Sequence, residues 1–223
     1  MSRQDAGVLT LVITVKLEDD KVIESPFILF KLNVSEDEFW SFAHEDLNCE
    51  LLDGVLVIHS PANQEHEDIF GYLYTLFRLY LDITGNGKVL GSRFVMHLAP
   101  KWNPEPDILV VKPEKFSNLK ESRLEGPADL IIEILSDATR DVDLNKKLPY
   151  YLTSGVGEVW IVDPDSKKIT IHGTGRVESY SDPDSTEIIR SKIFPDLAIQ
   201  VRWIWNRNDY SAMKMSKELV LKR

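Results

Sequence analysis

Two carboxylates are notable for where they lie in the sequence. Asp107 begins the apolar run "PDILVV", and Glu133 lies inside the next one, "DLIIEILS". An unpaired carboxylate in an apolar interior costs several kcal/mol, so Glu133 must be paired, neutralised or bound to a cation. Two carboxylates and a backbone carbonyl would suffice for a hard cation such as Mg²⁺ or Mn²⁺, which keeps several waters. Such a site polarises a phosphoryl oxygen and lowers the pKa of a bound water, which is the chemistry of metal-assisted hydrolysis.

Structural roles for the same acids remain open at this point. A Pro-Asp pair at the start of a strand is common turn chemistry, so Asp107 by itself is more often structural than functional. Glu133 stands between Ile132 and Ile134, and a buried ion pair would explain it about as well as a metal site. Spacing alone does not decide between the two interpretations.

The segment after Glu133 adds a basic residue. Asp143, Lys147 and Tyr151 recur at intervals of four, which places them on one helix face. At about 100° per residue, Lys147 borders an apolar stripe and is expected to point toward the sheet, whereas Lys146 faces water. A solvated Asp-Lys pair is the alternative. Pro149 interrupts the pattern, so the helix either begins late or is kinked there.

The surrounding pattern predicts the elements that must position these residues. Apolar residues at steps of three and four favour a helix over residues 65–81, and shorter apolar runs predict strands at 89–100, 106–113 and 126–136. A helix over 141–156 and a strand pair over 158–173 follow. The order helix, three strands, helix, strand is typical of an α/β fold around a mixed β-sheet, because successive strands lack a crossover helix.

The flanking segments are predicted to add to this core. Residues 8–15 and 22–33 are expected to form an extra N-terminal β segment. Ser35 and Glu38 have the spacing of a capping box, which predicts a short helix. A hairpin with Asp53-Gly54 as its turn is expected next, and residues 191–206 are expected to form one more strand and a closing segment. We therefore divide the chain into an N-terminal β extension (1–34), the main domain (35–205) and a C-terminal tail (206–223).

Composition limits the class of protein. The chain has 223 residues and a net charge of −10, which counts against a protein that grips nucleic acid with its whole surface. Cys49 is the single cysteine, which excludes an internal disulfide framework and a Cys-based zinc site and favours the cytoplasm. No run approaches the ~20 apolar residues of a membrane span, so no membrane partner is expected.

Four motifs in order resemble the Uma-two family, a bacterial family of restriction-endonuclease-like proteins in the PD-(D/E)XK nuclease superfamily. They are "CELLDGVLVIHSPANQEHEDIFGYLYTLF", "RFVMHL…PDILVV", "GPADLIIEILS" and "DLNKKLPYYLTSGVGEVWIVDP". The resemblance covers roughly residues 35–197. It implies a restriction endonuclease-like core and a divalent-metal site, with Mg²⁺ or Mn²⁺ as cofactor, that cleaves phosphodiester bonds of nucleic acid, DNA in particular.

The resemblance also assigns roles to individual residues. Asp107 and Glu133 match the two superfamily acids, and the Ile134 carbonyl and Glu50 match further metal ligands. The position two after Glu133 is Leu135, where the superfamily has lysine, and Lys147 on the next helix fits the displaced lysine that orients water or stabilises charge. The matching supporting positions are His66, Ser136, Asp143 and Tyr151, although His66 also fits a core histidine on the apolar helix stripe.

Three function classes follow from these observations. The leading hypothesis is a metal-dependent nuclease that uses Asp107, Glu133 and Lys147. The alternative is a non-catalytic interaction or regulatory protein that retains the nuclease scaffold, since a fold does not by itself imply cleavage. Another hydrolase or nucleotide-binding protein is disfavoured by the absence of a Gly-rich phosphate loop and of a G-x-S-x-G elbow. Exposed strand edges near the N-terminus favour a homodimer.

Overall fold

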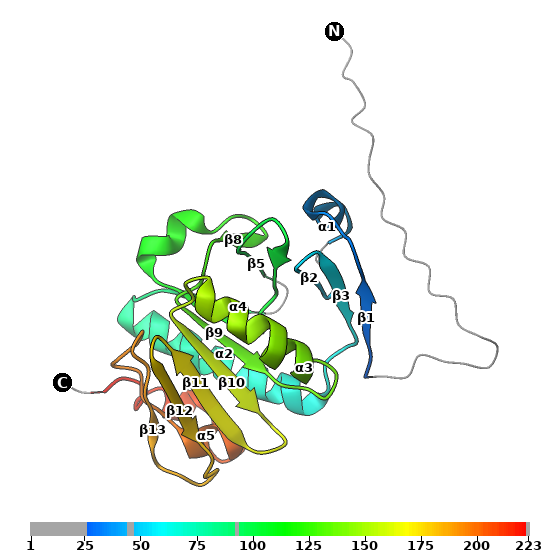
Figure 1. The fold of residues 1–223 in the computed structure, drawn as a ribbon. Coiled ribbons are helices and arrows are strands. Elements are labelled where there is room, and N and C mark those ends of the chain that lie inside the picture. Colours follow the sequence, from blue (N-terminus) through cyan, green and yellow to red (C-terminus); the bar gives the residue numbers. More distant parts are fainter. Residues whose placement is uncertain (1–25, 44–46, 92–93, 222–223) are drawn as a thin grey trace.

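A mixed six-stranded sheet forms the centre of the computed structural model, which describes residues 26–43, 47–91 and 94–221. Its strand order is β12-β11-β10-β9-β7-β4, with β9 and β10 parallel and the other neighbours antiparallel. Helix α2 covers one face and the α3–α4 segment covers the other (Figure 1). The elements are α2 (Gln64–Thr84), β4 (Lys88–Gly91), β7 (Ile108–Val111), β9 (Leu130–Ile134), α3 (Arg140–Val142), α4 (Leu148–Thr153), β10 (Glu158–Asp163), β11 (Lys168–Gly173) and β12 (Arg176–Tyr180).

Strand alternation decides what each face of the sheet carries. Leu130, Ile132 and Ile134 of β9 pack into the core under α2. Ile131 and Leu135 pack into a second core under α4. Because side chains alternate along a strand, Glu133 points to the α4 face. The predicted order of helix, three strands, helix and strand is confirmed, and the same alternation aims the buried acid at the helix that carries Lys147.

Helix α2 confirms the helix predicted over residues 65–81 and extends it at both ends. Asn63 caps its N-terminus by accepting a hydrogen bond from the His66 N–H. Gly85, at a φ of 69°, ends it in the left-handed conformation that glycine adopts at no steric cost. Its apolar stripe packs on the sheet, where the Phe77 and Trp160 rings meet edge to face at 5.5 Å.

The helix predicted over 141–156 has three parts. Between α3 and α4, residues Asp143–Lys147 form a π-turn, closed by a hydrogen bond from the Leu148 N–H to the Asp143 carbonyl. Pro149 then occupies the first turn of α4, where its missing N–H costs little. The π-turn allows the helical segment to continue through Pro149 without a steric clash. As predicted, Lys147 is buried and Lys146 is exposed.

A separate four-stranded antiparallel sheet, β1-β3-β2-β6, lies beside the core with helix α1 (Figure 1). Its elements are β1 (Ile28–Lys31), α1 (Glu36–Phe42), β2 (Cys49–Leu52), β3 (Val55–His59) and β6 (Trp102–Asn103). The predicted capping box of α1 is present, and Asp53 and Gly54 form the predicted turn, both with positive φ. Strand β1 pairs with β3 of its own chain, and the homodimer stays a prediction.

One expectation about the strands was wrong. Residues 89–100 do not form one strand, because β4 joins the core sheet while β5 (Val95–His97) pairs in parallel with β8 (Arg123–Glu125). Of the strand predicted over residues 22–33, the described part (26–33) contains β1, and the predicted strand at 8–15 lies outside the described residues. Gly91, Ser92 and Arg93 interrupt the apolar pattern between β4 and β5, which pair with different partners.

The chain after β12 returns to the α2 side of the sheet. Strand β13 (Ile188–Ile189) pairs with β14 (Ile199–Gln200), and α5 (Val201–Trp205) and α6 (Ala212–Met215) follow. A 3₁₀ helix, η1 (Pro113–Asn118), follows β7.

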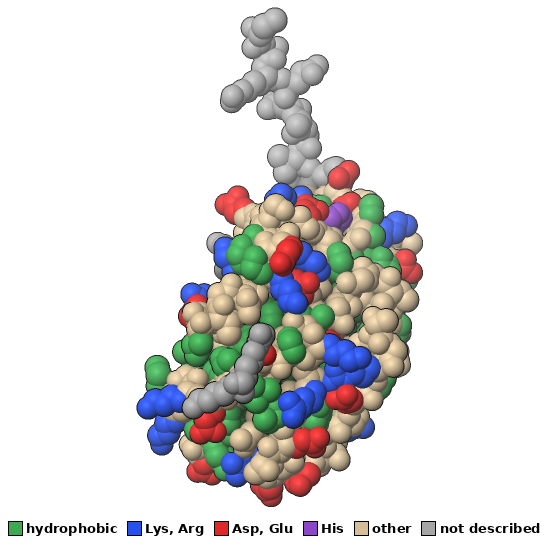
Figure 2. All heavy atoms as spheres, turned by 90° about the vertical axis from the view of Figure 1, so that its left-hand side faces the viewer, with side chains coloured by type: hydrophobic (Ala, Val, Ile, Leu, Met, Phe, Trp, Pro, Cys, Tyr) green, Lys and Arg blue, Asp and Glu red, His purple; other side chains and the backbone are tan. Residues whose placement is uncertain are grey.

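Among the described helices none is both long and apolar enough to span a bilayer. Acidic and basic side chains are interspersed over the face seen in Figure 2 rather than sorted into a basic stripe.

Arg140 anchors the start of α3 to the sheet. Its guanidinium donates to both oxygens of Asp163 at the end of β10, at 2.9 and 2.8 Å, and to Asp165 at 2.6 Å. These hydrogen bonds lower the pKa of Asp163 to about 2. The pair ties the segment that carries Lys147 to the strand beside Glu133.

We predict that Arg140→Ala lowers the free energy of unfolding by about 1 kcal/mol near neutral pH. Because the folded pKa of Asp163 is below its ordinary value of 3.8, this stability is present above that value and is lost as the pH falls through about 2. Urea unfolding and carboxyl NMR of Asp163 measure both effects. As a control, Lys214→Ala removes an exposed lysine from another part of the chain and should change stability by less than about 0.5 kcal/mol. If the pKa of Asp163 in Arg140→Ala stays at its wild-type value, the prediction is contradicted.

Candidate active site

Asp107 and Glu133 converge where β7 and β9 pair. The register aligns Ile108 with Ile132 and Leu109 with Ile131, and one step further along it Asp107 stands opposite Glu133. Both point to the α4 face, because alternate residues of each strand do so. The Asp107 N–H donates to Glu133 Oε2 at 3.4 Å. The two acids singled out in the sequence therefore share one end of the sheet.

Asp107 is held by two donors. The Ile134 N–H donates to its Oδ2 at 2.7 Å, and His66 Nε2 lies 3.2 Å from the same oxygen. In an extended strand the N–H and C=O of one residue point to the same edge, so the Ile134 carbonyl faces the side where Asp107 stands. The predicted trio of Asp107, Glu133 and the Ile134 carbonyl is gathered in one place.

Lys147 lies among three buried carboxylates. Its Nζ is 2.8 Å from Glu133 Oε1, 3.1 Å from Asp143 Oδ1 and 3.3 Å from Glu50 Oε2. A lysine ammonium has three N–H donors, and here each has a carboxylate to donate to. These partners outweigh burial and raise the pKa of Lys147 well above its ordinary value. Lys147 is therefore a permanent positive charge at the centre of the site.

One lysine does not balance the acids around it. Burial and the negative charges of Asp143, Asp107 and Glu50 raise the pKa of Glu133. Together these effects outweigh the attraction of Lys147, which lowers it, and the resulting pKa is about 8. Burial also raises the pKa of Asp143. Tyr151 donates to Glu133 Oε1 at 2.7 Å, and burial holds its own phenol pKa well above the ordinary value. The cluster has an excess of negative charge that a cation would relieve.

Glu50 reaches the site from the second sheet. Its Oε1 contacts His59 Nε2 at 2.9 Å, and its Oε2 accepts from the Glu105 N–H at 3.1 Å as well as from Lys147. Burial opposes ionisation, but Lys147 and His59 outweigh it and lower the pKa of Glu50 to about 2. Both Glu50 oxygens are thus engaged, as are those of Glu133, and the role of Glu50 as a metal ligand stays a prediction.

His59 was missed by the sequence reasoning. Cys49 pairs with Ile58 and Glu50 with Val57, so Glu50 and His59 are diagonal neighbours on one face of the hairpin. The Asp53-Gly54 turn sets this register. The proximity of His59 to Glu50 could therefore have been predicted from the sequence. The position of the Asp53-Gly54 turn determines which residues of the hairpin share a face.

His66 lies in the first turn of α2 and faces Asp107 rather than the core. Burial lowers its pKa, but the hydrogen bond to Asp107 and the charges of Asp107 and Glu67 outweigh burial and raise the pKa to about 9. The imidazolium therefore donates to Asp107. It sets the orientation of that carboxylate from the helix side.

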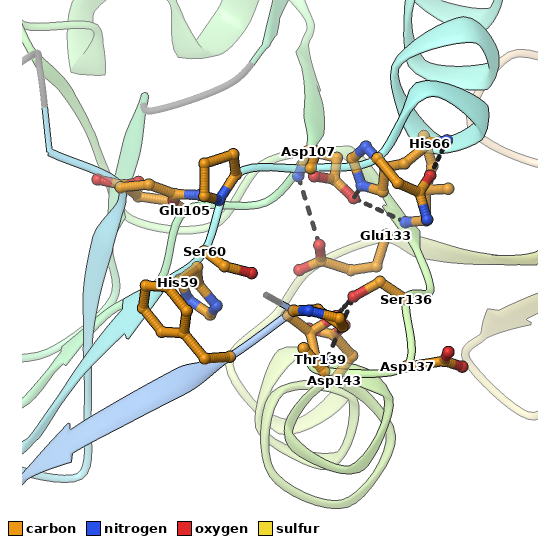
Figure 3. A pocket seen from close by; sticks show the side chains of 18 of the residues that line it. His59, Ser60, His66, Glu105, Asp107, Glu133, Ser136, Asp137, Thr139 and Asp143 are labelled. Carbon is orange, nitrogen blue, oxygen red and sulfur yellow. Dashed lines mark hydrogen bonds and ion pairs between the residues drawn. The ribbon is translucent and has the colours of Figure 1, made fainter. Parts of the chain in front are cut away.

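A cavity of about 440 Å³ opens above these residues. In Figure 3, His59 and Ser60 lie on one side of it and His66 and Asp107 on the other, with Glu133 between them. Ser136 shapes its floor: its Oγ lies 3.0 Å from Thr139 Oγ1 and accepts from the Thr139 N–H at 3.3 Å. Glu50, Asp107, Glu133 and Asp143 line this cavity, as do His59, His66, Ser136, Thr139 and Lys147.

The donor chemistry fits a hard divalent cation. Among residues 26–43, 47–91 and 94–221, no group of three or more His, Cys, Asp or Glu side chains is arranged to hold a metal ion together. Mg²⁺ requires less, since one or two carboxylates with waters and substrate oxygens complete its shell. Asp107 and Glu133 supply two carboxylates that stand opposite each other across β7 and β9.

Comparisons with known proteins agree with this geometry. The sequence matches the Uma2 family, described as "Putative restriction endonuclease", over residues 36–202. The chain belongs to the Uma2 family. Its fold is similar to that of "a putative nuclease belonging to DUF820 from Anabaena variabilis ATCC 29413", with a TM-score of 0.65 and 18% identity over 78% of this chain and 98% of that chain. Among curated proteins none matches. The predicted family and restriction endonuclease-like fold are confirmed, and both support a nuclease.

The contribution of Lys147 and its three carboxylate partners to the stability of this Uma2 protein can be measured. We predict that Lys147→Met costs about 3–5 kcal/mol of unfolding free energy, because it leaves buried carboxylates without their counter-charge. The loss should shrink as the pH is lowered, since the acids then take up protons on folding. Urea unfolding across pH measures it.

The neighbouring residue provides the control. Lys146→Met removes the same charge from an exposed position and should change stability by less than about 0.5 kcal/mol. If Lys147→Met does not fold, Lys147→Met with Glu133→Gln should recover part of the stability. If Lys147→Met and Lys146→Met lose equal amounts of unfolding free energy, the buried carboxylates do not need the Lys147 ammonium as their counter-charge.

Proposed function

We propose that this protein is a divalent-metal-dependent nuclease that hydrolyses phosphodiester bonds of nucleic acid, DNA in particular, at the Asp107–Glu133 site. The observation that carries the proposal is the opposition of these two acids across β7 and β9 beside a buried lysine. The donor set suits Mg²⁺ or Mn²⁺ held by Asp107, Glu133 and the Ile134 carbonyl. The bound ion would polarise the phosphoryl oxygen and lower the pKa of a water.

The reaction adds water across one P–O ester bond. The water oxygen bonds to phosphorus, the ester bond to the leaving oxygen breaks, and that oxygen takes up a proton. This chain's residues orient the reactants. Asp107 is held by His66 and the Ile134 N–H, and Glu133 by Tyr151 and Lys147, so both carboxylates are pre-positioned.

Lys147 would act as a charge rather than a base. Its pKa is raised well above the ordinary value, so it keeps its proton and donates hydrogen bonds. Its three N–H groups are directed at carboxylates, so it would orient the attacking water through Glu133 and, as a fixed positive charge, stabilise negative charge that develops on the phosphoryl oxygens. Lys147 reaches the site from the π-turn. A lysine on the strand itself would stand at position 135, which in this chain is a leucine packed under α4.

We predict that Asp107→Asn lowers kcat/KM at least 100-fold without loss of fold, and that activity requires added Mg²⁺ or Mn²⁺. Asparagine retains an oxygen that accepts the Ile134 N–H, whereas Asp107→Ala would also leave that donor unpaired at a cost of about 1–3 kcal/mol. Cleavage of labelled DNA with each metal, and after chelation, measures the effect.

The matched control is Asp82→Asn, an exposed acid near the other end of α2, which should keep the wild-type rate. Circular dichroism and thermal unfolding establish that each variant is folded. Equal activity in Asp107→Asn and wild type, or no cleavage by wild type over single-stranded, duplex and branched substrates, would favour a non-catalytic scaffold over a nuclease.

A further inference from the structure

The lining of the cavity is poorly suited to a run of phosphates. Proteins that follow a nucleic-acid backbone contact successive phosphates with Lys and Arg. Here Lys147 is the one Lys or Arg among the described lining residues, and its donors are already directed at carboxylates. Six acids line the same space: Glu50, Glu105, Asp107, Glu133, Asp137 and Asp143. Phosphates on either side of the reacting one would meet negative charge.

The size of the cavity also limits what can enter. Its volume of about 440 Å³ lies in the range of about 300–1,000 Å³ typical of small-molecule pockets. Such a space suits one nucleotide, not several stacked base pairs. Glu133 lies at its base and is only 2% exposed. A phosphodiester must therefore come down into the cavity to meet both acids.

Phe27 gives the cavity an aromatic wall. The residue lines the cavity and is partly exposed. Its carbonyl accepts a hydrogen bond from the Ser60 N–H at 3.0 Å, which fixes its backbone beside the end of β3. Figure 3 places Ser60 across the cavity from His66. Aromatic faces bind unstacked bases of any sequence, and they supply affinity where phosphate contacts do not.

We propose that the cavity takes a single unstacked nucleotide, with its base against Phe27 and its phosphodiester at Asp107 and Glu133. The substrate class is then single-stranded nucleic acid or a short oligonucleotide rather than an intact duplex. Taking a base out of a duplex costs free energy, and a site with few phosphate contacts has little binding energy to offset that cost. This inference rests on the nuclease activity proposed above.

The first experiment compares one dye-labelled oligonucleotide as a single strand and within a blunt duplex, at equal concentration with Mn²⁺. The single strand should be cut at least tenfold faster, and raising the salt concentration should change its KM only slightly. Equal rates on the two forms, or a steep salt dependence, would overturn this inference and leave the nuclease proposal standing. Cleavage of neither would overturn both.

The second experiment tests the aromatic wall. Phe27→Ala should raise the KM for the single strand about 5- to 100-fold with little change in kcat, and Phe27→Trp should restore it. Phe30→Ala is the matched control, because Phe30 lies in the adjoining strand β1, is exposed and does not line the cavity. An unchanged KM in Phe27→Ala, or an equal rise in Phe30→Ala, would refute the assigned base position.

Discussion

The ammonium of Lys147 and the three carboxylates around it constrain the rest of this structure. Glu133, Asp143 and Glu50 are almost completely buried, and acids at such depth need a counter-charge held at hydrogen-bonding distance. The three come from a core strand, from the π-turn and from the second sheet. One ammonium therefore fixes how the helix lies on the sheet and how the smaller sheet joins the core.

Several features serve to hold that charge in place. The π-turn directs Asp143 and Lys147 inward together and lets Pro149 enter the next helix without a steric conflict. Arg140 ties the same segment to the end of β10. The cluster still carries more negative than positive charge, and that imbalance makes the end of β7 and β9 attractive to a divalent cation. The structural ion pair and the metal site, which the sequence left as alternatives, are thus compatible, because Lys147 offsets only part of the acid.

Sequence reasoning succeeded where local periodicity carries the information. The apolar run around Glu133 predicts that this acid is buried, as it is, and helical spacing predicts that Lys147 points inward while Lys146 does not. It failed at residues 89–100, which were taken as one strand although Gly91, Ser92 and Arg93 interrupt the apolar pattern between β4 and β5. It also passed over His59 and Phe27. His59 is marked only by hairpin register, and Phe27 is brought to the cavity by the tertiary fold, where its carbonyl accepts a hydrogen bond from the Ser60 N–H.

The sequence by itself determined the order of the core elements, the inward face of the helix that carries Lys147 and membership in the Uma2 family, because these depend on residue types at short and regular spacing. Tertiary structure alone decided which acids share Lys147, which of them have raised or lowered pKa values, and where a cavity remains. Those properties depend on desolvation and on distances between segments that are far apart in the chain. A periodic pattern records which face a residue occupies, but not which distant residue it will meet there.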